Sequence, residues 1–265
     1  MIIALTVMTL VSPFFVAQLA AAIERPSVAG ATYAIGPPVA PRRCSVDMPG
    51  QTSAGLGGPG ANCGGPPPPP PSVQLGVDKT WYSADWGSSS TALSGLGCTR
   101  YLGAGYDTLN RRALVDTWAI LMGFCTLEAT AKVGQSFLVL GTGSMVASIR
   151  MNGHYEGEVH ALIAAAASAS IELHVKDTTT GTEWSTTIAN PSCSLACFID
   201  PVADFDKSVV VKLEAGHWYR VYLQINARAS LAAFFPVLGE AKVDFGPYDD
   251  DSTGGSWYNW FLVDF

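Results

Sequence analysis

Hydrophobic and polar residues alternate over long stretches in the C-terminal part of the chain, which is the pattern of strands with one buried face. In residues 147–163 the odd positions are apolar, namely Ile149, Met151, Tyr155, Val159 and Ile163. The even positions carry polar side chains from Arg150 to His160. A second alternating run covers residues 169–175. The two runs are predicted to pair as antiparallel strands that share a solvent face, with His174 and Glu172 beside the first run.

A second hairpin is predicted around the turn at residues 214–216, with residues 209–213 on one side and 217–226 on the other. Its inward side chains would be Tyr219, Val221, Leu223 and Ile225. Residues 109–122 fit both helical and strand periods, and the β-preferring residues Thr117, Trp118 and Ile120 favour a strand. Further strands are predicted at residues 127–133, 137–140, 182–188, 241–245 and 257–265.

These runs give eight or nine strands with no alternating helices. The sequence therefore predicts an all-β domain over residues 72–265, an antiparallel β-sandwich of the jelly-roll-like kind.

The N-terminal part predicts export. Residues 2–22 carry no charge and end in a run of small residues that suits signal peptidase. No Lys or Arg precedes the apolar run, so residues 1–22 are either a signal peptide or an uncleaved anchor. Residues 23–71 form a Pro/Gly-rich linker that ends in the six prolines Pro66 to Pro71. A polyproline run of this kind is a stiff spacer.

Composition excludes several classes of protein. Charged residues make up 14% of the 265 residues and hydrophobic residues 48%, which excludes a disordered chain and a coiled coil. The formal net charge of -7 leaves no basic surplus for phosphate groups. Nucleic acid is therefore not an expected partner.

The six cysteines indicate disulfide bonds in an oxidising compartment, because they form no CxxC pair and no zinc-binding pattern. Six cysteines allow 15 connectivities. Pairing of nearest neighbours is expected, since each pair falls in its own region, and buried free thiols are the alternative. The expected pairs are Cys44 with Cys63, Cys98 with Cys125, and Cys193 with Cys197.

An exported leader, a proline spacer and a β-domain together resemble the jelly-roll-like sandwiches displayed on microbial surfaces as adhesins, fibre subunits or sugar-binding modules. The resemblance is to a class of proteins and covers residues 72–265, without a family-specific motif. It implies a secreted or cell-surface protein with a structural, fibre-forming or adhesion role. Its partners would be other surface subunits, further copies of itself or extracellular polysaccharide.

The run from His154 to His160 contains the most concentrated candidate chemistry. Side chains two residues apart on a strand lie about 6.5 to 7 Å apart on one face, which places Glu156 beside Glu158. Two carboxylates near this separation suit retaining glycoside hydrolysis, so these two residues would be catalytic if the protein is an enzyme. A divalent metal held by His154, Glu156 and His174 is a second possibility, and a plain solvated strand face is the third.

No cofactor is expected apart from structural calcium, for which two acidic loops are candidate sites. The first contains Asp200, Asp204 and Asp206, and the second contains Asp249 to Asp251, with Asp249 and Asp251 as candidate ligands. Neither loop has the EF-hand spacing, and solvated turns are the alternative.

Aromatic residues supply a candidate sugar-binding surface. Tyr222 and Arg220 lie on the polar face of their predicted strand together with Trp218, where their rings and guanidinium group could contact a sugar. Burial in the core is the alternative for each ring.

The last strand ends in aromatic residues, with Trp257, Phe261, Val263 and Phe265 predicted on one face. Outer-membrane β-barrels end in a similar strand. Such a strand can also complete the sheet of a neighbouring subunit and build a fibre.

The chain contains no Gly-rich phosphate loop, no GxSxG elbow and no HExxH motif. The sequence therefore favours a non-enzymatic, disulfide-bonded surface module. A carbohydrate-binding or glycoside-hydrolase module and an outer-membrane barrel are the alternatives.

Overall fold

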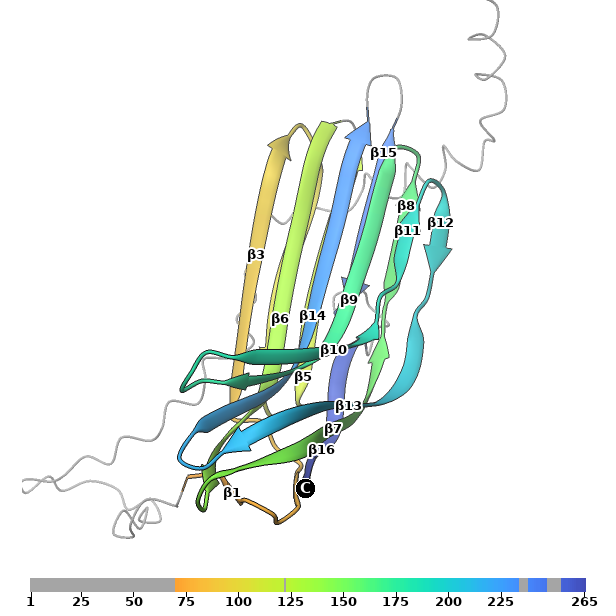
Figure 1. The fold of residues 1–265 in the computed structure, drawn as a ribbon. Helices are drawn as coiled ribbons and strands as arrows, with labels where there is room; N and C mark the ends of the chain where they lie inside the picture. The colour runs from red at the N-terminus through yellow and green to blue at the C-terminus, as the bar shows by residue number, and fades with distance from the viewer. Residues whose placement is uncertain (1–69, 122, 234–237, 247–253) are drawn as a thin grey trace, which may run out of the picture.

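The computed structural model describes residues 70–121, 123–233, 238–246 and 254–265 (Figure 1). These residues form two β-sheets and contain no helix, and so no helix that could cross a membrane. The predicted class, an all-β antiparallel sandwich, is confirmed. The described residues form 16 strands, more than the eight or nine expected.

The first sheet has seven strands, and the chain pairs along it in the order β1 (Ser72–Gln74), β6 (Gly123–Leu140), β14 (Trp218–Ala233), β9 (Ala165–Asp177) and β10 (Glu183–Ala189). Two more strands pair within this sheet, β3 (Trp86–Leu96) with β6 and β11 (Ser192–Ser194) with β9. The pairs are antiparallel, except that β1 runs parallel to β6.

The second sheet has nine strands, in the order β12 (Cys197–Ile199), β8 (Glu158–Leu162), β15 (Gly239–Phe245), β5 (Arg112–Leu121), β16 (Gly255–Asp264), β7 (Ser144–Glu156) and β13 (Val202–Glu214). The remaining two strands are β2 (Lys79–Trp81), which pairs with β16, and β4 (Thr99–Asp107), which pairs with β5.

The hydrophobic core lies between the two sheets and is built by the period-two pattern. On β14 the predicted inward residues Tyr219, Val221, Leu223 and Ile225 are all buried. A stack of three rings closes the lower part of the core. Trp81 lies with its ring centroid 5.0 Å from that of Phe137 and 4.9 Å from that of Phe261.

Both predicted hairpins are wrong in their pairing. The alternating runs at 147–163 and 169–175 belong to different sheets, because the chain crosses from β8 to β9 at the turn after Leu162. The turn at 214–216 likewise joins β13 of the nine-stranded sheet to β14 of the seven-stranded sheet. Alternation identifies the buried face of a strand, and strands that pair and strands that face each other across a core show the same alternation.

The predicted strand at 147–163 is also divided in two. Gly157 separates β7 from β8, and its backbone N–H donates to the carbonyl of Pro201, 3.2 Å away. A Cβ atom at Gly157 would lie 2.5 Å from the carbonyl oxygen of Asp244, so only glycine fits there. In contrast, the runs at 127–133 and 137–140 form the single strand β6, and the ambiguous segment 109–122 contains strand β5, as predicted.

Two of the three expected disulfides are present, Cys98–Cys125 and Cys193–Cys197. Cys44 and Cys63 lie outside the described residues, as do residues 1–69 with the predicted signal peptide and most of the linker. The two observed disulfides agree with folding in an oxidising environment.

Strand connections gather at two opposite ends of the sandwich. The end at the top of Figure 1, here called the upper end, receives the connections β3–β4, β5–β6, β8–β9, β11–β12 and β14–β15. Strand register shows that these connections are neighbours. The pairs at this end are Leu96 with Phe124, Ala233 with Gly123, Leu231 with Ala165, Gly239 with Leu121, and Cys197 with Ala161.

Candidate functional site

A row of rings crosses the outer face of the seven-stranded sheet. Strand register aligns Trp86 on β3, Gly134 on β6, Tyr222 on β14 and His174 on β9. The ring centroids of Tyr222 and His174 are 4.9 Å apart with planes 4° apart, and Trp86 meets Tyr222 edge-on at 5.4 Å. Gly134 permits this approach, because a Cβ there would lie 2.6 Å from the Cβ of Tyr222.

Charged groups enclose the ring row. The hydroxyl of Tyr222 donates to Glu183 at 2.5 Å, and His174 lies 2.8 Å from Glu183 and 2.9 Å from Glu172. The Arg220 guanidinium lies 4.1 Å above the Trp86 ring. Burial and the contact with Glu183 raise the pKa of Tyr222, so this phenol stays protonated and keeps its hydrogen bond.

The predicted sugar-binding residues are therefore placed differently from the expectation. Arg220 and Tyr222 do lie on the outer face of one strand, but Tyr222 is only 2% exposed and its ring is covered by its neighbours. Trp218 is 38% exposed and lies at the lower end of β14, where its backbone N–H donates to the Thr179 hydroxyl. Stacking on a sugar needs an open ring face, which Tyr222 does not offer.

A second charged cluster lies on the outer face of the nine-stranded sheet around His160 on β8. Its Nδ1 atom is 3.1 Å from Glu158, and its Nε2 atom is 3.6 Å from Glu240 on β15. Lys242 contacts Glu158 at 2.9 Å, and the indole N–H of Trp118 donates to Glu240 at 2.8 Å. Burial alone would lower the pKa of His160, but the two carboxylates outweigh burial and raise it to about 9.

The two candidate catalytic carboxylates are separated by the break at Gly157. Glu156 ends β7, where it pairs with Val202, and Glu158 begins β8, where it pairs with Asp244. The hydrogen bond to His160 lowers the pKa of Glu158, and Lys242 adds to this against the effect of burial. A general acid for glycoside hydrolysis needs a raised pKa, so Glu158 is unsuited to that role.

The expected metal site is not assembled. His154 and Glu156 lie on β7 of the nine-stranded sheet, whereas His174 lies on the outer face of the other sheet, with the core between them. His154 contacts Asp204 at 2.6 Å and the Trp257 ring at 4.7 Å between centroids. In the parts of the chain that the structure describes, no group of three or more His, Cys, Asp or Glu side chains is arranged to hold a metal ion.

The acidic loops are only partly described. Asp204 contacts His154 as above, and Asp206 forms a two-pronged ion pair with Arg150 at 2.5 Å on each arm. Asp200 lies between β12 and β13. Asp249 and Asp251 lie outside the described residues.

The last strand is an internal strand of its own sheet. β16 pairs with β7, β5 and β2, and Tyr258, Phe261 and Val263 are fully buried. A bulge between Tyr258 and Trp260 changes which face of the sheet the side chains point to. Trp257 therefore contacts His154 on the outer face and does not share the face of Phe261. Within this chain the strand therefore completes its own sheet, and its donation to a neighbouring subunit stays a prediction.

The strand β3 forms an open edge of the seven-stranded sheet (Figure 1). It pairs with β6 along all 11 residues, and among the described residues no strand pairs with its other side. Its residues from Ser89 to Leu96 are exposed, and the strand carries no charged residue and no proline. Sequence alternation misses β3 and β4 because both are rich in Gly, Ser and Ala.

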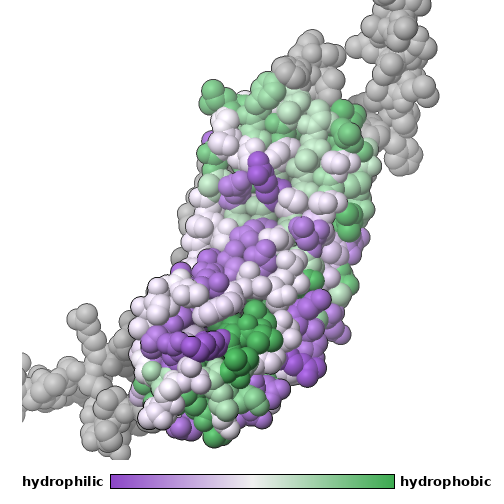
Figure 2. Space-filling view, viewed as in Figure 1, coloured by the Kyte–Doolittle hydropathy of each residue, from purple (hydrophilic) through white to green (hydrophobic). Residues whose placement is uncertain are grey.

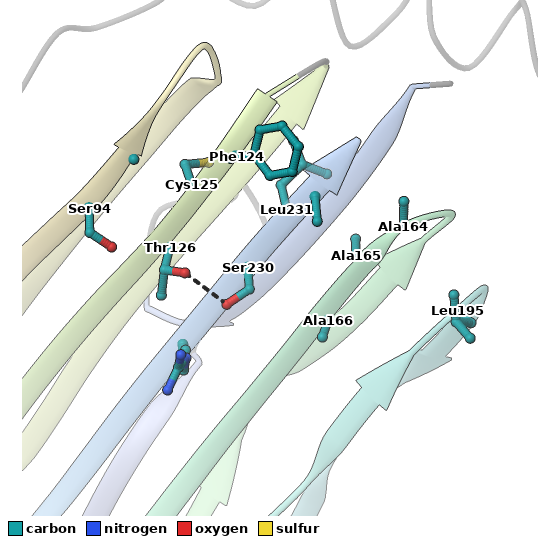
Figure 3. Close-up of a pocket in the computed structure, with 13 residues that line it drawn as sticks. Ser94, Phe124, Cys125, Thr126, Ala164, Ala165, Ala166, Leu195, Ser230 and Leu231 are labelled. Carbon is teal, nitrogen blue, oxygen red and sulfur yellow. Dashed lines mark hydrogen bonds between the residues drawn. The ribbon is translucent and has the colours of Figure 1, made fainter. Parts of the chain in front are cut away.

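The upper end of the seven-stranded sheet carries a shallow hollow of about 670 Å³ (Figure 3). Phe124 and Leu231 stand on one side of it, the alanines 164–166 form its floor and far side, and Leu195 lies beyond them. Thr126 and Ser230 contact each other at 3.3 Å near its lower border. Arg228 also lines the hollow and pairs with Glu128 at 3.7 Å, and most of the remaining lining residues are apolar.

Comparison with known proteins adds no assignment: no protein-family model matches this chain, and no curated protein matches its sequence.

Proposed function

We propose that residues 72–265 form a non-catalytic structural module of the cell surface that assembles with a second copy of itself through the open edge of β3. The observation that carries this proposal is an 11-residue, uncharged and exposed edge strand. Edge strands present unpaired backbone N–H and C=O groups, and natural proteins usually protect them with charges, prolines or bulges.

A comparison within the molecule supports a specific role for β3. Two other long edge strands, β4 and β13, carry charges: Arg100 and Asp107 lie on β4, and Asp204, Asp206, Lys207 and Lys212 lie on β13. Such charges oppose edge-to-edge pairing. The chain thus protects these two edges and leaves β3 unprotected.

The β3 edge is also held firmly in place. The disulfide from Cys98 to Cys125 ties the chain just beyond β3 to β6, next to the pair Gly95 and Cys125. At Gly95 the φ angle is +91°, and a Cβ would overlap the carbonyl of Phe124, so β3 lies very close to β6 there. A fixed edge loses little conformational entropy when it pairs, which favours binding.

Antiparallel pairing of β3 with β3 of a second copy fits these features best. It produces a closed dimer about a twofold axis, the commonest symmetry of protein assemblies, and antiparallel ladders are slightly more stable than parallel ones. The opposite edge of the same sheet is a poorer pairing partner for β3, because β10 has only seven residues and lies against β13.

The test compares dimerisation of edge variants of the exported protein by light scattering after size exclusion across a dilution series. With the twofold axis at Thr91, Ser90 of one copy faces Ala92 of the other. Ser90→Lys with Ala92→Lys then places like charges directly opposite each other and is expected to abolish the dimer. A mixture with Ser90→Glu, Ala92→Glu is expected to restore it.

The matched control places the same two charges on the other edge of the sheet. Ser185→Lys with Thr187→Lys on β10 is expected to leave the dimer intact, since both side chains are exposed there. A wild-type protein that stays monomeric at every concentration, or a lysine pair on β3 that changes nothing, would contradict the proposal.

A further inference from the structure

We propose that the upper end of the sandwich docks on a lipid bilayer, with its turns inserted shallowly into the membrane. This inference does not rest on the proposed dimer. It rests on three observations, namely the composition of the upper turns, their backbone conformation and the order of polarity below them.

The three connections at the upper end that the structure describes in full, β3–β4, β8–β9 and β11–β12, lie within uncharged stretches of sequence. These stretches are residues 86–99, 161–171 and 184–199. The large side chains that this end exposes are apolar, including Leu96 at 83%, Leu195 at 73% and Phe198 at 62% exposure. Figure 2 shows hydrophobic surface gathered at the top of the visible face, hydrophilic surface over its middle, and a separate hydrophobic patch among hydrophilic groups lower down.

The backbone of these turns shows that apolar residues are kept at a conformational cost. Four non-glycine residues at this end have positive φ, namely Leu121, Ala164, Leu195 and Ala196, at φ angles between 54° and 83°. Gly and Asn adopt this conformation more easily. A polar Asn would therefore suit these turns better if solvent were their only surroundings.

The opposite end provides the contrast. There the turns contain Asp107, Asp177 and Glu214. Oδ1 of Asp107 accepts a hydrogen bond from the backbone N–H of Leu109, and Oδ1 of Asp177 accepts one from Thr179. Among the described residues at that end, the one non-glycine residue with positive φ, Arg111, is charged. Polar turn chemistry is thus used at one end of this domain and absent from the sequence of the other.

The order of side chains below the upper end matches the depth profile of a bilayer. On the nine-stranded sheet, Ile120 is followed two residues lower by Trp118 beside Tyr101, at a depth of about 7 Å. Trp and Tyr favour the membrane interface because they combine an apolar ring with a polar atom. The indole N–H of Trp118 donates to Glu240, which pairs with Ile120 and marks the border of the uncharged end on this sheet.

Charges of both signs begin at this level on the nine-stranded sheet, where Glu240 pairs with Ile120 and Lys242 with Trp118, and the uncharged surface extends further down on the seven-stranded sheet. On the seven-stranded sheet the first ion pair is Glu128 with Arg228 at 3.7 Å, four residues below Phe124 and Ala232. Four residues of strand correspond to about 13 Å. Arg100, near the tip of β4, is long enough to keep its guanidinium at the level of the head groups. Balanced charge predicts binding to zwitterionic lipid that changes little with salt.

The test is flotation of the exported full chain with phosphatidylcholine vesicles. The variant Ile163→Ser, Leu195→Asn, Phe198→Ser, which leaves β3 unchanged, is expected to lower vesicle binding at least tenfold, and its Asn eases the backbone at 195 so that the fold is kept. The matched control is Leu109→Ser with Val210→Ser, which removes exposed apolar side chains away from the upper end and is expected to bind as wild type.

A second readout separates docking of this end from binding by any retained leader. The fluorescence of Leu195→Trp is expected to be quenched by brominated phosphatidylcholine more strongly than that of Leu109→Trp. Equal quenching at the two positions, or unchanged binding by the triple variant, would overturn the proposal. Loss of self-association in the triple variant, without any vesicle binding by wild type, would also overturn it and make this end an interface between copies.

Discussion

Each of the four histidines in the chain lies against at least one carboxylate: His154 against Asp204, His160 against Glu158 and Glu240, His174 against Glu172 and Glu183, and His217 against Asp177. All four lie on the outer faces or in a turn, outside the apolar core. These contacts account for the candidate catalytic and metal-binding residues as parts of a polar surface network. His160 bridges two strands of the nine-stranded sheet, and His174 bridges two strands of the seven-stranded sheet.

The His160 cluster predicts a specific dependence of stability on pH. Because the pKa of His160 is raised from 6.5 to about 9, its contribution to the free energy of unfolding is complete below pH 6.5 and is lost as the pH rises through about 9. Glu158 and Glu240 have lowered pKa values, so their contribution is complete above pH 4.5 and is lost as the pH falls further. His160→Gln is expected to destabilise the protein by about 1–3 kcal/mol at pH 6.

Denaturant unfolding between pH 6 and pH 10 measures this effect. Wild type is expected to lose stability across the range, and His160→Gln is expected to lose less. NMR titration of the His160 ring checks the cause directly. A ring that titrates near its ordinary value of 6.5 would refute the account of this cluster.

The two disulfides act at the scale of the strand connections and close loops of different length. Cys98 and Cys125 are 27 residues apart, and Cys193 and Cys197 are four apart. In the chain-entropy model the longer loop gives about 3–4 kcal/mol of stability and the shorter about 2 kcal/mol. Replacing Cys98 and Cys125 by Ala is therefore expected to lower the free energy of unfolding more than replacing Cys193 and Cys197. Denaturant unfolding that ranks the two variants in the opposite order would contradict this.

At the element scale, sequence alternation predicts buried faces well and strand partners poorly. It correctly identifies the inward residues of β14, because each inward side chain must be apolar. It assigns residues 169–175 to the wrong sheet, because the local alternation of a strand does not determine which other strand it pairs with. It misses β3, whose edge position leaves most of its side chains exposed and removes the alternation.

The candidate site was predictable to a similar degree. Arg220 and Tyr222 are correctly placed on the polar face of β14. Trp86 and Glu183, which cover and bind Tyr222, come from β3 and β10. Their approach depends on contacts between residues far apart in sequence, so the polar pattern of β14 alone predicted an exposed ring.

The whole molecule has two proposed contact surfaces, the β3 edge and the upper end. Because β3 strands would pair antiparallel, the two upper ends of a dimer point in opposite directions along the strands. Such a dimer can hold two lipid surfaces together, which is an adhesive function. Wild-type protein is therefore expected to cluster phosphatidylcholine vesicles, as seen by dynamic light scattering.

The two classes of variant separate the steps of this adhesion. Ser90→Lys with Ala92→Lys is expected to bind vesicles without clustering them, since it keeps the upper end and loses the dimer. The triple variant of the upper end is expected to dimerise but neither to bind vesicles nor to cluster them. Clustering that persists in the β3 variant would show that vesicles are joined by another route.

Backbone hydrogen exchange along β3 tests assembly most directly, because pairing with a second copy converts its free edge amides into hydrogen-bonded ones. Exchange of the full chain is compared at low and at high concentration. The account predicts that amides in Trp86–Leu96 exchange more slowly at high concentration, whereas those of the charged edge β13 are unchanged. Exchange in β3 that is the same at both concentrations, in samples that light scattering shows to be dimeric at the higher one, would contradict it.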